Sequence, residues 1–287
     1  MPPEPTPDAR SCASPPIVPL RVALIGKGGA GKSAISGTLA RVLARRGHRV
    51  LALDVDTLPG LALSLGLSPD TVGDAGLPEE LGERQPERGW MLREGVDVAA
   101  LVDAHAAGGP DGVRFLQLGK LPGRVKPGST TAFRAVLEGF RVEGWTMIGD
   151  LAAGTRQPFF GWSDFAEIIL VVVDPSAKAV ITARRLGRLA QTAGDEPGAD
   201  TAEQRAPLVG FIANKLRSTD DLRRIEHALP GLPQLAAVPY DEQLAAAERL
   251  GRAPIDIVPA GPAVAAIQEL AARLEQLAGA RGQGAQW

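Results

Sequence analysis

A glycine-rich segment, residues 26–33, constrains the fold of this chain more than any other part of its sequence. It reads Gly-Lys-Gly-Gly-Ala-Gly-Lys-Ser and meets the G-x-x-x-x-G-K-[ST] pattern. An apolar run at residues 21–26 leads into it, and residues 31–46 carry apolar side chains at helical spacing. Glycines let backbone N–H groups turn inward around phosphate oxygens, and a following helix directs its positive N-terminus at the same anion. The segment therefore predicts a strand, a phosphate-binding loop and a helix, in that order.

The positions of this loop have distinct predicted tasks. Lys32 is placed to bridge the β- and γ-phosphates of a nucleotide, and the Ser33 hydroxyl to ligate Mg²⁺. The alternative is a glycine-rich turn without a ligand, which the flanking strand and helix disfavour. The residues expected to touch the nucleotide are Gly26, Gly28, Gly29, Ala30, Gly31, Lys32, Ser33 and Ala34.

The rest of the chain alternates predicted strands and helices. Residues 49–54 form a second strand, and because a helix separates it from the first, the sheet is expected to be parallel at this point. Residues 70–112 are rich in Gly, Pro, Glu and Asp and predict loops with short helices, and residues 194–206 predict a polar surface loop. We expect one α/β domain with a doubly wound, mainly parallel sheet flanked by helices. Further strands are expected at residues 113–118, 145–149, 168–173, 208–213 and 234–238, and helices at 129–140 (capped by Ser129 or Thr130), 177–193 and 263–277.

Composition and charge exclude several classes of protein. Lys plus Arg is 31 and Asp plus Glu is 33, a balance that argues against a dedicated nucleic-acid binder. The longest strongly apolar run, residues 168–173, is too short to cross a bilayer. Residues 1–19 are dense in proline and lack a secretory signal, so we expect a disordered leader and a cytoplasmic location. An ordered domain is expected over residues 20–279, with a flexible tail at 280–287.

Lys27 adds a second lysine at the front of the loop. The sequence K-G-G-A-G-K-S resembles the deviant phosphate loop of the MinD/ParA-type ATPases, the superfamily that includes the nitrogenase iron protein. The resemblance implies a P-loop NTPase fold, binding of ATP with Mg²⁺, hydrolysis of ATP and an ATP-dependent homodimer. It also implies that Lys27 crosses the dimer interface, where its charge stabilises the charge developing on the partner's nucleotide. The alternative is a solvated lysine at the edge of the loop.

Carboxylates follow two predicted strands. The resemblance implies that Asp56, in the element Asp-Val-Asp, positions the attacking water, and that Asp54 lies closer to the Mg²⁺ ion. Proline follows the second aspartate in most relatives, whereas Thr57 follows it here. The later Asp-x-x-x-Gly spacing resembles a Walker B strand and second switch, in which Asp150 holds Mg²⁺ through water and the Gly154 N–H senses the γ-phosphate. The alternative for each carboxylate is a solvated strand end.

Two later segments resemble the base-binding elements of the family. In the Asn-Lys element, the amide of Asn214 is matched to the edge of adenine. Pro239 and Asp241 fall in a segment that resembles the later base-binding loop. The alternative for Asn214 is an ordinary asparagine at the end of a strand.

Residues 118–186 are most similar to the CooC-type ATPases, which mature nickel carbon-monoxide dehydrogenase. Those relatives carry a C-x-C pair that forms an interfacial metal site, and Arg124 and Lys126 stand at the two cysteine positions here. Two cations cannot ligate Ni²⁺ or Zn²⁺, and Cys12 is the only thiol of the chain, so direct metal carriage and an iron–sulfur cluster are not expected. This basic loop either binds an acidic client or an anion, or is simply solvated.

Four aromatic residues gather within seven positions behind the second switch. Exposed aromatic side chains there would suit docking of a client protein, and the alternative is packing beneath the switch. The four are Phe159, Phe160, Trp162 and Phe165.

Three functions remain open at this point. The first is a dimerising Mg-ATP-dependent ATPase that switches a protein client, such as a metalloenzyme under maturation. The second is a ParA- or MinD-like positioning or partition ATPase, which needs a basic or membrane-binding surface, and the mixed charge of residues 269–287 provides no such tail. The third is a nucleotide sensor that does not hydrolyse ATP. We expect neither nucleic acid nor membrane as a partner.

Overall fold

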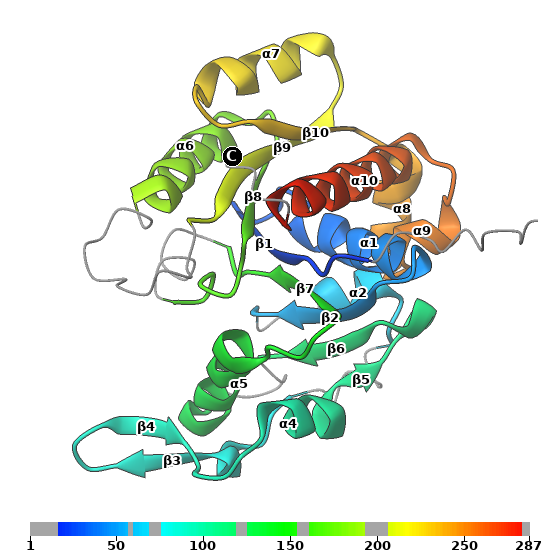
Figure 1. The fold of residues 1–287 in the computed structure, drawn as a ribbon. Coiled ribbons are helices and arrows are strands. Elements are labelled where there is room, and N and C mark those ends of the chain that lie inside the picture. Colours follow the sequence, from blue (N-terminus) through cyan, green and yellow to red (C-terminus); the bar gives the residue numbers. More distant parts are fainter. Residues whose placement is uncertain are drawn as a thin grey trace, which may run out of the picture.

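The computed structural model describes residues 17–56, 60–68, 76–118, 125–153, 161–192 and 206–282 of the 287-residue chain. Its main sheet has eight strands in the order β10-β9-β8-β1-β7-β2-β6-β5 (Figure 1). Neighbouring strands are parallel, except that the edge strand β5 runs antiparallel to β6. The predicted mainly parallel α/β sheet is confirmed. The strands are β1 (Arg21–Gly26), β2 (Arg49–Asp54), β5 (Ala107–Gly108), β6 (Arg114–Gln117), β7 (Trp145–Asp150), β8 (Ile168–Val173), β9 (Leu208–Leu216) and β10 (Gln234–Pro239).

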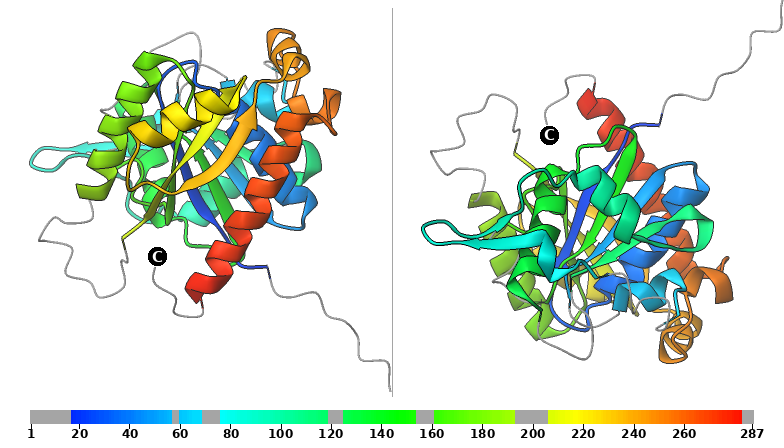
Figure 2. Two further views of the ribbon diagram at one scale, coloured as in Figure 1. Left: turned by 90° about the horizontal axis from the view of Figure 1, so that it is seen from above. Right: turned by 90° about the horizontal axis from the view of Figure 1, so that it is seen from below.

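Helices cover both faces of this sheet (Figure 2). One face carries α1 (Lys32–Arg45), α2 (Gly60–Leu65), α8 (Glu242–Arg249), α9 (Pro254–Ile257) and α10 (Pro262–Gly282). The other face carries α4 (Val98–His105), α5 (Pro127–Gly139), α6 (Ala177–Thr192) and α7 (Thr219–Ala228). Two 3₁₀ turns, η1 (Glu79–Leu81) and η2 (Pro110–Gly112), connect elements, and β3 (Gly82–Gln85) with β4 (Gly89–Leu92) forms a separate antiparallel hairpin.

The central strands show why the sheet is buried on both faces. In β1, Val22 and Leu24 belong to the core beneath α1 and α10, whereas Ala23 and Ile25 belong to the core beneath α5 and α6. Successive side chains of a strand point to opposite faces, so a strand covered on both sides needs a continuous apolar run. Each fully buried Leu or Ile contributes roughly 1.5–3 kcal/mol relative to an exposed one.

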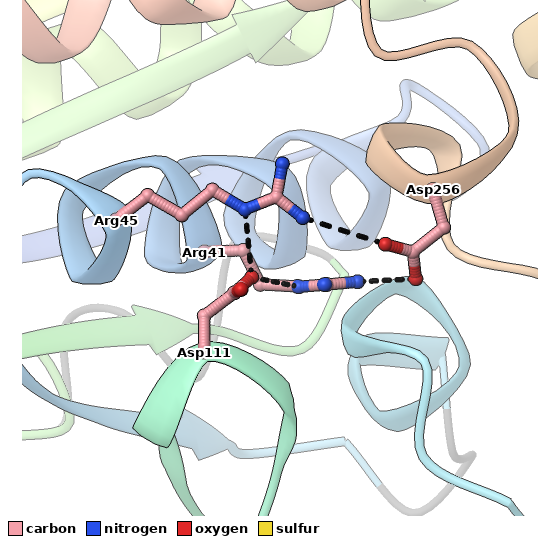
Figure 3. Close-up of polar contacts among 4 residues, drawn as sticks. All are labelled: Arg41, Arg45, Asp111 and Asp256. Carbon is pink, nitrogen blue, oxygen red and sulfur yellow. Dashed lines mark hydrogen bonds and ion pairs between the residues drawn. The ribbon is translucent and has the colours of Figure 1, made fainter.

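An ion-pair cluster ties α1 to two distant segments (Figure 3). The guanidinium of Arg41 donates to Asp111 of η2 at 2.7 Å and to Asp256 of α9 at 2.5 Å. Arg45, one turn later, donates to the same two carboxylates at 2.9 and 3.4 Å. The side chain of Arg41 is 4% exposed and that of Arg45 is 42% exposed. The cluster therefore joins the helix behind the glycine-rich loop to segments that lie 70 and 215 residues away.

In the segment at residues 70–112, the part that the structure describes, residues 76–112, is more regular than its composition indicates. The expected short helices exist as α4, η1 and η2, but the prediction missed the β3–β4 hairpin, which extends away from the main sheet (Figure 1). Its strands are mostly half-buried or exposed, so they lack the alternation that marks a strand. The hairpin packs on α5 where Gly82 approaches Gly128, and a Cβ added to Gly82 would lie 2.5 Å from the Gly128 Cα.

Other element boundaries differ from the prediction. Helix α5 begins at Pro127, and the expected cap by Ser129 or Thr130 is wrong: Lys126 is the N-cap, and the Thr130 hydroxyl donates to its carbonyl at 3.1 Å. Proline favours the first position of a helix because the missing N–H would have no partner there. Strand β9 extends to Leu216, α10 runs on to Gly282, and α7, α8 and α9 were not predicted. Residues 194–205 lie outside the described residues, and no helix in the described ranges is long and apolar enough to cross a membrane.

Candidate functional site

The glycine-rich loop connects the carboxyl end of β1 to the start of α1. Gly26 has φ +154°, and a Cβ there would lie 2.5 Å from the carbonyl oxygen of Val172. Gly29 and Gly31 have φ of +80° and +94°, values that side chains with a Cβ rarely adopt. Gly31 is the N-cap of α1, and no side-chain cap bonds to the first turn of the helix. Its N–H groups are therefore available to an anion held by the loop.

Two carboxylates lie side by side at the same edge of the sheet. Asp54 and Asp150 are paired in the β2–β7 register, and both are buried. Burial, followed by repulsion from Asp150, raises the pKa of Asp54 well above its ordinary value. Burial also raises the pKa of Asp150 to about 6, although the nearby Ser33 hydroxyl and Lys32 ammonium lower it. Buried acidic groups beside a lysine are a common feature of functional sites.

The hydrogen bonds of these carboxylates leave room for a cation. Asp54 accepts from the backbone N–H of Asp56 at 2.9 Å and from that of Leu61 at 3.3 Å. Oδ1 of Asp150 is buried and has no hydrogen-bond partner in the described part of the chain. Mg²⁺ takes few protein carboxylates and fills its shell with phosphate oxygens and water. The Asp54, Asp150 and Ser33 oxygens fit an ion of this kind.

Two neighbouring cavities open beside the loop. The first has about 300 Å³ and the second about 460 Å³, and both are lined by Gly31, Ala34 and Lys215. Aliphatic side chains dominate the floor of the first, whereas the second reaches Lys32 and Ser33. The remaining walls of the first cavity are Ile35, Asn214, Val238, Pro239, Tyr240, Asp241, Leu244, Ala245, Glu248, Arg249, Ala263 and Ile267; those of the second are Gly29, Gly60, Leu63, Ser64, Glu248, Arg249, Gly251 and Arg252.

The predicted base-binding residues lie at the first cavity. The side-chain amide of Asn214 donates to the Ala30 carbonyl at 2.7 Å. Pro239 and Asp241 line the same cavity from the end of β10. Asp241 also caps α8, because its Oδ1 accepts from the backbone N–H groups of residues 243 and 244. The structure thus brings these three residues together with the phosphate loop.

Other predicted site residues have different surroundings. Lys27 is half-buried, and its ammonium lies 3.4 Å from the carbonyl oxygen of Gly28 in its own loop. Lys126 forms an ion pair with Glu79 at 2.8 Å, beside the β3–β4 hairpin. Gly154 and Arg124 lie outside the described residues.

The aromatic segment behind the second switch divides in two. Trp162 and Phe165 are buried in the core beneath α5, where Trp162 stacks at a tilt near Phe133 with ring centroids 6.3 Å apart. For these two residues the docking interpretation is wrong and the packing interpretation is confirmed. Phe159 and Phe160 lie outside the described residues.

Sequence reasoning missed the residues that α8 and β9 bring to the cavities. Glu248, Arg249 and Arg252 face the phosphate loop from more than 200 positions away in the sequence, and no motif marks them. Lys215 follows Asn214 directly, so the Asn-Lys element already pointed to it.

Comparison with known proteins agrees with this geometry. Residues 22–255 match the model of the CobQ/CobB/MinD/ParA nucleotide binding domain. The chain belongs to this family. Its mainly parallel sheet also matches the fold of MinD from Pyrococcus horikoshii, solved in complex with Mg-ADP, with a TM-score of 0.60 and 19% identity over 90% of this chain and 96% of that one.

Relatives within the family include further ATP-binding proteins. An uncharacterized ATP-binding protein of Methanocaldococcus jannaschii is 29% identical over 250 residues, which cover 83% of this chain and 91% of the relative. The carbon monoxide dehydrogenase accessory protein CooC of Rhodospirillum rubrum is 28% identical over 260 residues, which cover 84% of this chain and 91% of CooC. The similarity to MinD/ParA-type proteins predicted from the phosphate loop is confirmed, as is the similarity to CooC predicted from residues 118–186.

Proposed function

We propose that this chain is an ATP hydrolase that binds Mg-ATP, dimerises around the nucleotide and acts on a protein client. The observation that carries the proposal is the pair of neighbouring cavities beside the phosphate loop, which share Gly31, Ala34 and Lys215 as lining residues. The apolar cavity of about 300 Å³ suits a purine base, and the second cavity, with Lys32, Arg249 and Arg252 among its walls, suits phosphates. A ligand that needs both cavities is a nucleotide.

Different residues of the chain would bind the phosphates, hold Mg²⁺ and orient the attacking water. Backbone N–H groups of the loop and the Lys32 ammonium would bind the phosphates and balance the charge that develops on them. The Ser33 hydroxyl and, through water, Asp54 and Asp150 would hold Mg²⁺, which supplies charge neutralisation at the phosphate oxygens when bound. Asp56 would orient the attacking water. It lies two residues after the last residue of β2, and its backbone N–H donates to the Asp54 carboxylate.

Dimer formation is proposed on the basis of Lys27. The half-buried Lys27 donates one long hydrogen bond, 3.4 Å, within its own loop, a bond that it can exchange for a contact with a second copy of the chain. A lysine that enters the partner's site adds positive charge where charge develops during phosphoryl transfer.

The proposed client is a protein, and assembly of a metalloenzyme is the proposed setting. The support is the 28% identity to an accessory protein of carbon monoxide dehydrogenase. Direct metal carriage is not part of the proposal, because Lys126 offers an ammonium that is paired with Glu79 rather than a metal ligand.

Turnover and oligomeric state test the proposal together. We expect the wild-type chain to hydrolyse Mg-ATP and to sediment as a dimer with ATP. Asp56→Ala should bind ATP and remain dimeric without hydrolysis, and Lys27→Ala should lose the dimer. Asp220→Ala, which changes an exposed carboxylate of α7, is the control and should behave as wild type. ATP binding without any turnover in the wild type would favour a nucleotide sensor, and normal turnover in Asp56→Ala would refute the role of that residue.

A further inference from the structure

Two consecutive residues of β9 hold two consecutive carbonyl groups of the phosphate loop. The side-chain amide of Asn214 donates to the carbonyl of Ala30 at 2.7 Å. The ammonium of Lys215 donates to the carbonyl of Gly29 at 2.8 Å. The two donors lie 184 and 186 residues away from their acceptors, so the end of β9 is fastened to the loop at two adjacent points.

The backbone of Lys215 is unusual in a way that makes this arrangement possible. Adjacent side chains of a regular strand point to opposite faces of the sheet. Lys215 instead has φ +60°, one of two positive values among non-glycine residues of the described segments. The left-handed conformation costs roughly 1–2 kcal/mol for a residue with a Cβ, and it redirects the Lys215 side chain toward the loop that Asn214 also reaches.

Asn214 and Lys215 together form a clamp on the loop, and the loop backbone leaves room for both side chains. A Cβ added to Gly31 would lie 2.3 Å from the Asn214 amide nitrogen and 3.6 Å from Cε of Lys215. Any side chain at Gly31 would therefore displace the Asn214 amide, whereas the stem of Lys215 lies at ordinary contact distance. The glycine in this position is required by its φ of +94° and also by the Asn214 side chain packed over it.

We propose that Asn214 and Lys215 are positioning residues that preorganise the phosphate loop for polyphosphate binding. Carbonyl oxygens that turn toward a phosphate repel it, whereas N–H groups attract it. Two donors that hold the Gly29 and Ala30 carbonyls keep the loop in the conformation whose N–H groups serve the anion, before any ligand arrives. Preorganised donors bind more tightly because no ordering cost is incurred on binding. This inference rests on the proposed nucleotide site, and it gives Asn214 a task at the loop in addition to any contact with a base.

The clamp predicts a binding defect that does not depend on the base. Dissociation constants for Mg-ATP and for inorganic tripolyphosphate are measured by competition with a fluorescent ATP analogue on the full-length chain. Lys215→Met keeps most of the side-chain stem and removes the ammonium, and we expect it to weaken both ligands about tenfold, the lower end for a hydrogen bond to a charged group. Asn214→Ala should also weaken tripolyphosphate, and Lys215→Arg should recover most of the affinity. Arg223→Met removes an exposed cation of α7 and should change neither constant.

A second variant separates positioning from folding. Lys215→Gly removes the strain of the positive φ together with the ammonium, so its melting temperature should equal or exceed that of the wild type while its affinity for tripolyphosphate falls. The clamp is overturned if the wild type binds both ligands and Lys215→Met binds them within twofold. It is equally overturned if these variants weaken ATP but leave tripolyphosphate unchanged. A folded wild type that binds neither ligand overturns the proposed function itself.

Discussion

The buried guanidinium of Arg41 permits a direct test of how the helix behind the phosphate loop is held. Arg41 bonds two carboxylates, Asp111 and Asp256, and its side chain is 4% exposed. A hydrogen bond to a charged group contributes roughly 1.5–3 kcal/mol, and breaking a fully buried ion pair costs roughly 3–5 kcal/mol. The carboxylates are 23% and 45% exposed, so water replaces part of the lost interaction. We therefore expect Arg41→Met to lower the free energy of unfolding by about 2–3 kcal/mol.

Arg45 supplies a matched control on the same helix. It bonds the same two carboxylates, but its side chain is 42% exposed. Exposed ion pairs contribute about 0–1 kcal/mol, so Arg45→Met should cost less than about 1 kcal/mol. Urea unfolding of the wild type and both variants, followed by circular dichroism, gives the two differences at unchanged m-value. Equal losses in the two variants, or a larger loss for Arg45→Met, would refute the argument that burial sets the strength of this cluster.

Three further predictions concern pH and packing. Burial raises the pKa of Asp111, but hydrogen bonds from the two arginines of α1 outweigh burial and leave the pKa below its ordinary value. Asp111 therefore stabilises the folded chain fully above the pKa that it has in the unfolded chain, and this stabilisation is lost as pH falls through the lower pKa of the folded chain. The difference in unfolding free energy between wild type and Asp111→Asn should accordingly shrink between pH 6 and pH 3. Burial raises the pKa of Asp150 to about 6, so calorimetry should find Mg-ATP affinity falling by up to about tenfold per pH unit below that value, a dependence that Asp150→Asn should lose. Gly37→Ala would place a Cβ 2.6 Å from that of Ser64 and should destabilise the chain by about 1–3 kcal/mol in urea, whereas Gly279→Ala, on an open face of α10, should stabilise it by about 0.5–1 kcal/mol.

The sequence was sufficient where the determinants of structure are local. Strands β1, β2 and β8 match the predicted ranges because a strand covered on both faces is an uninterrupted apolar run bounded by glycine or aspartate. The phosphate loop was equally predictable from the sequence, because the conformation of its glycines and the position of Lys32 are determined by their own backbone and immediate neighbours. The family resemblance had placed Asp54 and Asp150 near one Mg²⁺ ion, and the structure pairs them because the carboxyl ends of parallel strands share one edge of the sheet.

Other features depend on contacts between distant segments. The β3–β4 hairpin lacks a strand pattern because it is shaped by the close approach of Gly82 to Gly128 on α5. The residues of α8 that line the cavities could not be predicted, because they reach the phosphate loop only after the chain turns back behind β10. The hydrogen bond from Lys215 to the Gly29 carbonyl depends on the left-handed backbone of Lys215 itself. A lysine in a sequence does not predict that conformation.

A titration of Mg-ATP into the full-length chain, followed by isothermal calorimetry, tests the central claim most directly. The account predicts one nucleotide bound per chain, and loss of that binding in Lys32→Met, a variant that keeps the buried stem but removes the charge. A folded wild-type chain that takes up no ATP, or a Lys32→Met variant that binds it as tightly as the wild type, would contradict the assignment of this loop as the nucleotide site.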